Sequence, residues 1–292
     1  MHFVEAKGIL SSKNGMNIYR GCLHGCIYCD SRSRCYGFTH DFEDIEVKEN
    51  AVYLLEKALR SKRKKCMIGT GSMCDPYISV EEKLGLTRHC LEVIDQYEFG
   101  VAIQTKSTRI LRDMDLLSSI NRKAKAVVQM TMTTFDEELC KIVEPNVSTT
   151  KERFEALLQF KEAGIPTVVW LTPILPFIND TEDNIRGILD YCIKADVKGI
   201  ICFDMGVTLR EGDREYFYQA LDKHFPGLKS KYIRTYGNAY EVPSPNAKAL
   251  MRLFQEICDE NGIMRYPMDC FAYLNEFPEK YEQISLFGTT GS

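Results

Sequence analysis

The chain has 292 residues, of which 45% are hydrophobic, and it carries a formal net charge of -4. This length and apolar content predict one large folded domain rather than a disordered scaffold. The acidic balance excludes a surface that grips duplex nucleic acid by bulk positive charge, because phosphate binding needs clustered Lys and Arg.

The first ten residues, MHFVEAKGIL, are too short and too mixed in polarity for an export or membrane signal. The chain has twelve cysteines, and without such a signal they indicate a reducing compartment in which thiols stay free. We therefore expect a cytoplasmic protein with no membrane partner.

Three cysteines near the start of the chain have the spacing C-x3-C-x2-C: Cys22, Cys26 and Cys29. Three thiolates this close can converge on one soft metal centre, and iron–sulfur clusters are held by such thiolates. The spacing favours three ligands with one iron left open. A structural zinc site is the alternative, since zinc prefers four ligands and His24 or Cys35 could complete the set.

Strand and helix patterns then alternate along the chain. After a first strand that precedes the cysteines, strands are predicted at 66–69, 99–104, 126–132, 166–171 and 199–205, and helices at 45–59, 84–97, 110–120, 136–142, 151–163, 181–193 and 247–261. Such alternation predicts βαβ units and a parallel sheet of an α/β fold. A doubly wound open sheet is the alternative architecture, but no G-x-G-x-x-G follows the first strand.

The run NIYRGCLHGCIYCDSRS, with Tyr28 directly before Cys29, resembles the radical S-adenosylmethionine (SAM) enzymes. The similarity is greatest to their spore photoproduct lyase-related branch, also described as DNA repair photolyase-like. The resemblance implies a partial (β/α)6 TIM-type barrel with a short C-terminal extension. We expect the barrel over residues 1–235, with a C-terminal helix and an aromatic-rich tail packed on it over residues 236–292.

The same resemblance implies two cofactors, a 4Fe-4S cluster on the three cysteines and SAM on the open iron. Enzymes of this kind cleave SAM reductively to methionine and a 5'-deoxyadenosyl radical, which takes a hydrogen atom from the substrate. A reductant such as flavodoxin or ferredoxin supplies the electron. Conventional acid–base hydrolysis has little support, because the five histidines are scattered singly along the chain.

Loops after the predicted strands match the SAM-binding positions of this family. Gly71 and Ser72 lie where the family has the loop that contacts the methionyl amino group of SAM. Lys106 matches a lysine that pairs with the SAM carboxylate in the related lyases. Gln129 and Thr131 would face the ribose hydroxyls, and Tyr28 would also contact SAM. The alternatives are that Lys106 is exposed to solvent, and that Gln129 and Thr131 form hydrogen bonds within the protein core.

Cys74 lies in the region where spore photoproduct lyases carry a hydrogen-donating cysteine. The matching position is Ser72, two residues earlier, so a catalytic donor role for Cys74 and an inert buried thiol both remain open.

The resemblance suggests damaged DNA as the substrate. The alternatives are radical SAM modification of a peptide, an RNA or a small molecule, or a non-catalytic iron–sulfur or zinc protein. The tail sequence Gln283-Ile-Ser-Leu-Phe287 resembles a peptide that docks on the sliding clamp through two apolar anchors. The alternative is that these side chains pack against the barrel.

Overall fold

The computed structural model describes residues 1–278. Its centre is a six-stranded sheet in the order β2-β5-β6-β7-β8-β9, in which every neighbouring pair is parallel. The strands are β2 (Gly15–Met16), β5 (Met67–Thr70), β6 (Gly100–Thr105), β7 (Ala126–Thr131), β8 (Thr167–Trp170) and β9 (Gly199–Ile201). The chain order of these strands matches their order in space, with helices between them, so the expected partial barrel is confirmed.

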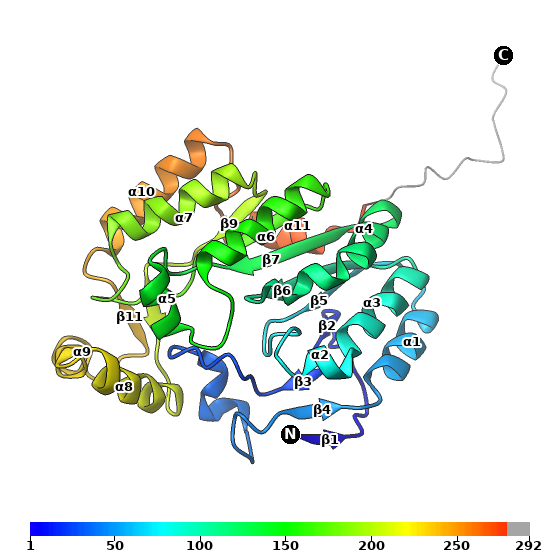
Figure 1. The fold of residues 1–292 in the computed structure, drawn as a ribbon, viewed down its shortest axis with the longest axis horizontal. Helices are drawn as coiled ribbons and strands as arrows, with labels where there is room; N and C mark the ends of the chain where they lie inside the picture. Colours follow the sequence, from blue (N-terminus) through cyan, green and yellow to red (C-terminus); the bar gives the residue numbers. More distant parts are fainter. Residues whose placement is uncertain (279–292) are drawn as a thin grey trace.

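Helices cover the outside of this sheet (Figure 1). They are α1 (Ala51–Ser61), α2 (Glu81–Leu84), α3 (Leu86–Gln96), α4 (Met114–Lys123), α5 (Glu137–Val143), α6 (Thr150–Glu162), α7 (Glu182–Lys194), α8 (Asp213–His224), α9 (Leu228–Tyr236), α10 (Ala247–Glu260) and α11 (Pro267–Asn275). Several begin at a side chain that accepts a backbone N–H, such as Asp136 before α5 and Thr181 before α7. Thr149 and Glu152 form a complete capping box on α6.

The two faces of the sheet are buried in different ways. Alternate β7 residues such as Val128 and Met130 belong to the large apolar core beneath the outer helices. Val127 points to the other face, where it packs in a smaller apolar group with Cys270 and Leu274 of α11. The helix α11 therefore covers part of the inner wall of the barrel. The expected division of the chain at residue 235 stays a prediction.

Two small sheets flank the barrel. One has the order β1-β4-β3, formed by β1 (His2–Val4), β4 (Glu46–Lys48) and β3 (Tyr19–Arg20), and the other pairs β10 (Gly206–Thr208) with β11 (Glu241–Pro243). The predicted helix at 45–59 is therefore wrong in its first part. Val47 is fully buried in β4 between half-buried neighbours, which is strand alternation, and the helix α1 begins only at Ala51.

Among residues 1–278, no helix combines the length and the apolar character that crossing a membrane requires.

Candidate active site

The three motif cysteines lie in one loop, residues 21–30, which we call the cysteine loop; it follows β3. Cys26 is buried, and Cys22 and Cys29 are half-buried. The loop is tied to the segment after α5, because Ile27 N–H donates to the Val143 carbonyl at 3.0 Å and Asn146 N–H donates to the His24 carbonyl at 3.1 Å. These bonds fix the cysteines at the carboxyl edge of the sheet.

The three motif cysteines lie near one another. Besides burial, the charges of Cys22 and Cys29 each raise the pKa of Cys26, and the charge of Cys22 raises that of Cys29. Within residues 1–278, their sulfur atoms do not all lie within 4.8 Å of one another. Three thiolates on one loop are the donor set of an iron–sulfur cluster with one iron left open.

Cys22 differs from the other two motif cysteines in its pKa. Its interaction with Cys74 and then that with His24 lower the pKa of Cys22 well below its ordinary value, although burial opposes the shift. Burial raises the pKa of Cys26 and of Cys29 instead. The positive charge of Lys106 opposes the effect of burial at both of these thiols, so this lysine faces the cysteine loop.

A buried ionic network lies beneath Tyr28. The Tyr28 hydroxyl donates to the Glu144 carboxylate, whose other oxygen lies 2.5 Å from the Arg153 guanidinium. Burial disfavours the ionised Glu144, but Arg153 and Lys106 more than offset this and hold its pKa below the usual range. The Arg153 guanidinium also donates to the Thr131 carbonyl at 2.9 Å. The network thus joins the cysteine loop to the end of β7.

Sequence reasoning missed Arg153, although it left a signal. The buried positions of α6 include Arg153, Ala156, Leu157 and Phe160, so a cation stands on the apolar stripe of a helix. A buried cation needs a paired anion, and Glu144 supplies it.

Asp75 is a second organising residue, and it was not among the site residues predicted from the sequence. Its Oδ1 accepts from the Thr105 hydroxyl at 2.7 Å, and its Oδ2 accepts from the Lys106 N–H at 2.7 Å. The same Oδ2 lies 3.5 Å from Nδ1 of the buried His24. Asp75 therefore connects the loops after β5 and β6 to the cysteine loop and fixes the backbone of Lys106.

Gly71 occupies a position that only glycine fits. Its φ of +100° lies in the left-handed region, and a Cβ there would lie 1.9 Å from the Gln104 carbonyl. Ser72 follows and is exposed. The loop after β5 thus presents its backbone and the Ser72 side chain to a ligand.

Gln129 and Thr131 share the inner face of β7, as the alternation predicted, but their partners differ. Gln129 Oε1 accepts from the indole N–H of Trp170 at 2.9 Å. Thr131 is 2% exposed, and its hydroxyl has no hydrogen-bond partner among the described residues. A buried hydroxyl without a partner costs free energy, so the site of Thr131 fits a ligand that carries hydroxyl groups, as the ribose of SAM does.

Cys74 lies directly against the cysteine loop. Its thiol donates to the Gly21 carbonyl at 2.6 Å and interacts with the Cys22 sulfur. Burial raises its pKa well above the ordinary value, so the group is a neutral thiol beside the candidate site. This position is compatible with either of the two roles expected from the sequence.

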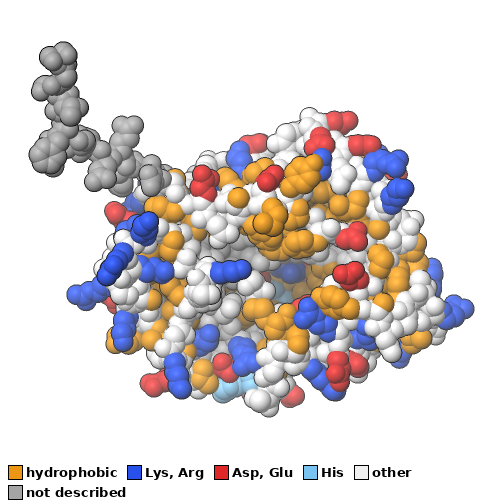
Figure 2. All heavy atoms as spheres, turned by 180° about the vertical axis from the view of Figure 1, so that it is seen from behind, with side chains coloured by type: hydrophobic (Ala, Val, Ile, Leu, Met, Phe, Trp, Pro, Cys, Tyr) orange, Lys and Arg blue, Asp and Glu red, His pale blue; other side chains and the backbone are white. Residues whose placement is uncertain are grey.

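Three aromatic side chains meet on the inner side of the barrel. The Trp170 ring centroid lies 6.2 Å from that of Phe203 and 5.9 Å from that of Phe271, and the last two lie 6.2 Å apart. Trp170 ends β8, Phe203 follows β9 and is 58% exposed, and Phe271 belongs to α11. We call these residues the aromatic trio. Figure 2 shows one face of the molecule hollowed near its middle, with hydrophobic side chains around the hollow.

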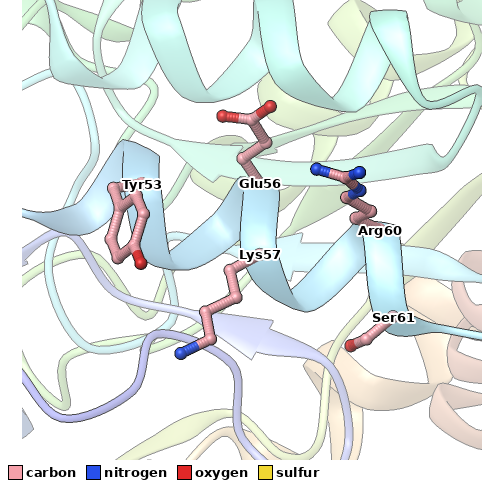
Figure 3. Close-up of a pocket in the computed structure, with 5 residues that line it drawn as sticks. All are labelled: Tyr53, Glu56, Lys57, Arg60 and Ser61. Carbon is pink, nitrogen blue, oxygen red and sulfur yellow. The ribbon is translucent and has the colours of Figure 1, made fainter.

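A surface pocket elsewhere has no comparable chemistry. It is lined by Tyr53, Glu56, Lys57, Arg60 and Ser61, all from α1 (Figure 3). No strand-end loop contributes to it, so it is separate from the candidate site.

The segment before α8 and the first turn of α8 support the residues that follow the cysteine loop. Gly212 has a φ of +102°, and a Cβ on it would lie 2.8 Å from the Arg32 carbonyl. Arg34 N–H donates to the Glu211 carbonyl at 2.9 Å, and the Arg32 guanidinium lies 3.7 Å from the centre of the Tyr216 ring. Residues far along the chain thus hold the segment that follows Cys29. The clamp-like peptide Gln283 to Phe287 lies outside the described residues.

Comparisons with known proteins show the family of the chain. The family model described as the radical SAM superfamily matches residues 16–221. An uncharacterized protein of Mycobacterium tuberculosis (strain ATCC 25618 / H37Rv) is 27% identical over 250 residues, covering 81% of this chain and 71% of the relative. An uncharacterized protein of Methanocaldococcus jannaschii is 33% identical over 176 residues, covering 60% of this chain and 65% of that protein.

Among solved structures, a spore photoproduct lyase mutant with bound AdoMet and dinucleoside spore photoproduct superposes with a TM-score of 0.60. The two are 14% identical, over 87% of this chain and 74% of the lyase. At 14% identity, this similarity shows that the two proteins share a fold and no more. The family match spans the cysteine loop and all the strands of the six-stranded sheet after β2. The chain therefore belongs to the radical SAM superfamily, whose cofactors are a 4Fe-4S cluster and S-adenosylmethionine.

Proposed function

We propose that this enzyme cleaves SAM reductively at the cysteine loop and acts on a base of damaged DNA. One observation supports this placement of the chemistry. The cysteine loop, the buried Glu144–Arg153 pair with the half-buried Lys106 near it, and the unpartnered Thr131 hydroxyl lie at one edge of the sheet. In parallel barrels this carboxyl edge is where catalytic loops lie.

In this proposal Cys22, Cys26 and Cys29 each bind one iron. When bound, the cluster and SAM supply a one-electron cleavage that yields methionine and a 5'-deoxyadenosyl radical able to take a hydrogen atom from the substrate. A flavodoxin or ferredoxin of the cytoplasm supplies the electron. The buried position of Cys26 keeps solvent from its side of the loop.

The remaining site residues hold SAM. The loop at Gly71 and Ser72 offers backbone groups to the methionyl amino group, and Lys106 balances the negative charge of the SAM carboxylate. Burial lowers the pKa of Lys106, but the negative charges of a Cys26 thiolate and of the Glu144 carboxylate more than compensate and raise it, so the ammonium form is favoured. The Thr131 hydroxyl forms a hydrogen bond with the ribose of SAM, and Gln129 lies beside it on the inner face of β7. Tyr28 holds the cysteine loop in place through its bond to Glu144.

The test of SAM cleavage compares two cysteine variants. Protein reconstituted with iron under anaerobic conditions is reduced, mixed with SAM and assayed for 5'-deoxyadenosine. We expect the wild type and Cys35→Ala to produce it, because Cys35 is exposed and outside the motif. Cys26→Ala should contain less iron and give none. Equal production by Cys26→Ala would contradict the proposed ligand set.

Two observations support a base-bearing substrate. The fold is shared with spore photoproduct lyases whose structures hold a dinucleoside spore photoproduct. The aromatic trio lies on the inner wall of the barrel, and exposed aromatic rings stack on nucleobases with about 1–3 kcal/mol per base. With a net charge of -4, stacking on a base rather than backbone charge would have to supply much of the affinity.

The substrate is tested by binding. A single-stranded oligonucleotide with one thymine photoproduct should bind more tightly than its undamaged counterpart, and Phe203→Ala should weaken that binding about tenfold. Tyr53→Ala is the matched control, since Tyr53 is an exposed aromatic residue on α1 outside the site. Equal affinity for damaged and undamaged strands, with no effect of Phe203→Ala, would favour a peptide, an RNA or a small molecule as the substrate.

A further inference from the structure

We propose that His2, His40 and Asp44 form a second metal site, for zinc, on the small sheet β1-β4-β3. One ligand atom from each of the three side chains lies within 4.8 Å of the others. Nδ1 of His2 is 3.0 Å from Oδ2 of Asp44. Ligands bound to zinc at about 2.0–2.2 Å in a tetrahedron lie about 3.3 Å apart. The distance between His2 and Asp44 is thus close to that of a zinc coordination shell, and His40 lies within 4.8 Å of both ligand atoms.

The hydrogen bonding of the His40 ring supports a metal ligand. Nδ1 of His40 is 2.9 Å from the Asp41 carbonyl oxygen, and a carbonyl can only accept, so Nδ1 carries the proton. Nε2 then presents a lone pair, and this atom is buried without a hydrogen-bond partner among the described residues. Metal-binding histidines are commonly held in this way, with the second ring nitrogen bonded to a carbonyl. A bound cation would satisfy the buried Nε2.

The local fold brings the ligands together. The parallel pairing of β1 with β4 sets His2 opposite Glu46, whose Oε2 lies 3.9 Å from Nε2 of His40. Asp44 closes a turn by donating its N–H to the Asp41 carbonyl at 3.0 Å. The α-amino group of Met1 lies 2.5 Å from Oδ1 of Asp44, which leaves Oδ2 on the side of His2. Asp44 and Glu46 together bring two carboxylates to the site, and Asp44 also pairs with the Met1 ammonium.

The donor set selects the metal. Two imidazole nitrogens and a carboxylate suit zinc, whereas calcium and magnesium prefer oxygen ligands alone. The proposed set contains no cysteine, so the site differs in chemistry from the cysteine loop. Its role is structural: it joins β1 to the segment 40–44, which leads from the cysteine loop to β4.

The first experiment measures zinc and iron together in the full-length protein, purified without oxygen, incubated with equimolar zinc and desalted. We expect about one zinc per chain in the wild type. His40→Ala and the more exposed His2→Ala should each lose most of the zinc and keep the iron. His89→Ala is the matched control, because His89 is exposed on α3 and pairs with Glu92 at 3.0 Å. Circular dichroism verifies that each variant is folded.

The second experiment identifies the ligands by zinc-edge X-ray absorption, to which iron does not contribute. Nitrogen and oxygen neighbours at about 2.0–2.2 Å with imidazole scattering are expected. Sulfur neighbours at about 2.3 Å would place the zinc on cysteines and overturn the proposal. It is also overturned if the wild type retains no zinc, or if folded His40→Ala and His2→Ala retain as much as the wild type. In the last case the His2–Asp44 contact is an ion pair only.

Discussion

The Arg153 guanidinium and the Glu144 carboxylate form an ion pair in the interior, 2.5 Å apart, and neither side chain is exposed to solvent. Glu144 also accepts from the Tyr28 hydroxyl of the cysteine loop, and Arg153 donates to the carbonyl at the end of β7. Removing one partner of such a pair leaves an uncompensated buried charge.

Glu144→Gln should therefore be strongly destabilising. We expect the free energy of unfolding to fall by about 3–5 kcal/mol and the iron content to fall with it, because Tyr28 loses its charged acceptor. Chemical denaturation and iron analysis measure the two effects. Glu138→Gln is the control, since Glu138 pairs with Lys141 on the surface at 2.6 Å and should change stability by less than about 1 kcal/mol. A Glu144→Gln protein as stable as this control would show that the buried pair has no structural role.

The unpartnered hydroxyl of Thr131 makes Thr131→Val informative. Valine has the same shape without the hydroxyl, so the apoprotein should be as stable as the wild type or about 1 kcal/mol more stable, while the affinity for SAM falls about five- to tenfold. Melting temperature and equilibrium binding of SAM to the iron-loaded protein separate the two.

Thr87→Val gives the opposite pattern as a control. Its buried hydroxyl donates to the Pro76 carbonyl at 2.8 Å, so its removal should lower stability and leave SAM affinity unchanged. If Thr131→Val is destabilised like Thr87→Val and binds SAM normally, the Thr131 hydroxyl serves the core instead.

Cys74→Ala distinguishes a hydrogen donor from a metal ligand. We expect this variant to keep its iron and to form 5'-deoxyadenosine, because the motif cysteines remain, but to lose turnover of a thymine photoproduct. Cys90→Ala is the control, since Cys90 is an equally buried thiol on α3. Iron analysis and product chromatography are the measurements. Full turnover by Cys74→Ala would assign Cys74 as an inert buried thiol, and loss of iron would assign it to the metal centre.

Asp213 gives a pH-dependent prediction. It is 1% exposed, burial raises its pKa to about 6 from 3.8, and its Oδ2 has no partner among the described residues. Because the folded state holds the proton more tightly than the unfolded state, stability falls as the pH rises from about 4 to 6 and stays lower above that. The loss is at most about 3 kcal/mol.

Asp213→Asn should remove this loss. Asparagine can still accept from the Arg210 N–H, which lies 2.6 Å from Oδ1. Its melting temperature should therefore exceed that of the wild type at pH 7 and approach it at pH 4. Asp222→Asn is the control, since Asp222 is exposed on the same helix and pairs with Lys229. A difference that does not change with pH would contradict the raised pKa.

The sequence predicted the parts of the fold that depend on local pattern. The alternation of apolar residues over β5 to β9 located the barrel, and the cysteine spacing located the candidate site. Inner-face positions such as Thr131 followed from the two-residue period of β7. These features are encoded by neighbouring residues.

Other features depend on contacts between distant residues and could not be predicted in the same way. Val47 forms a strand because β1 and β3 pair with it from both sides. The acceptor of the Tyr28 hydroxyl is Glu144, on a different loop, and Asp75 gains its partners from β6 and the cysteine loop. Each of these features arises from contacts with distant parts of the chain, and the residues next to it in the sequence do not indicate it.

The close approach of Gly212 to the Arg32 carbonyl has a consequence for how the enzyme matures. The segment around Arg32 is held in part by the segment around Gly212, which is synthesised much later. While the ribosome is still translating the barrel, the cysteines have already emerged without this support. The segment that follows Cys29 therefore reaches its final packing only after residue 212 has been synthesised, so the surroundings of the cysteine loop are completed late in synthesis.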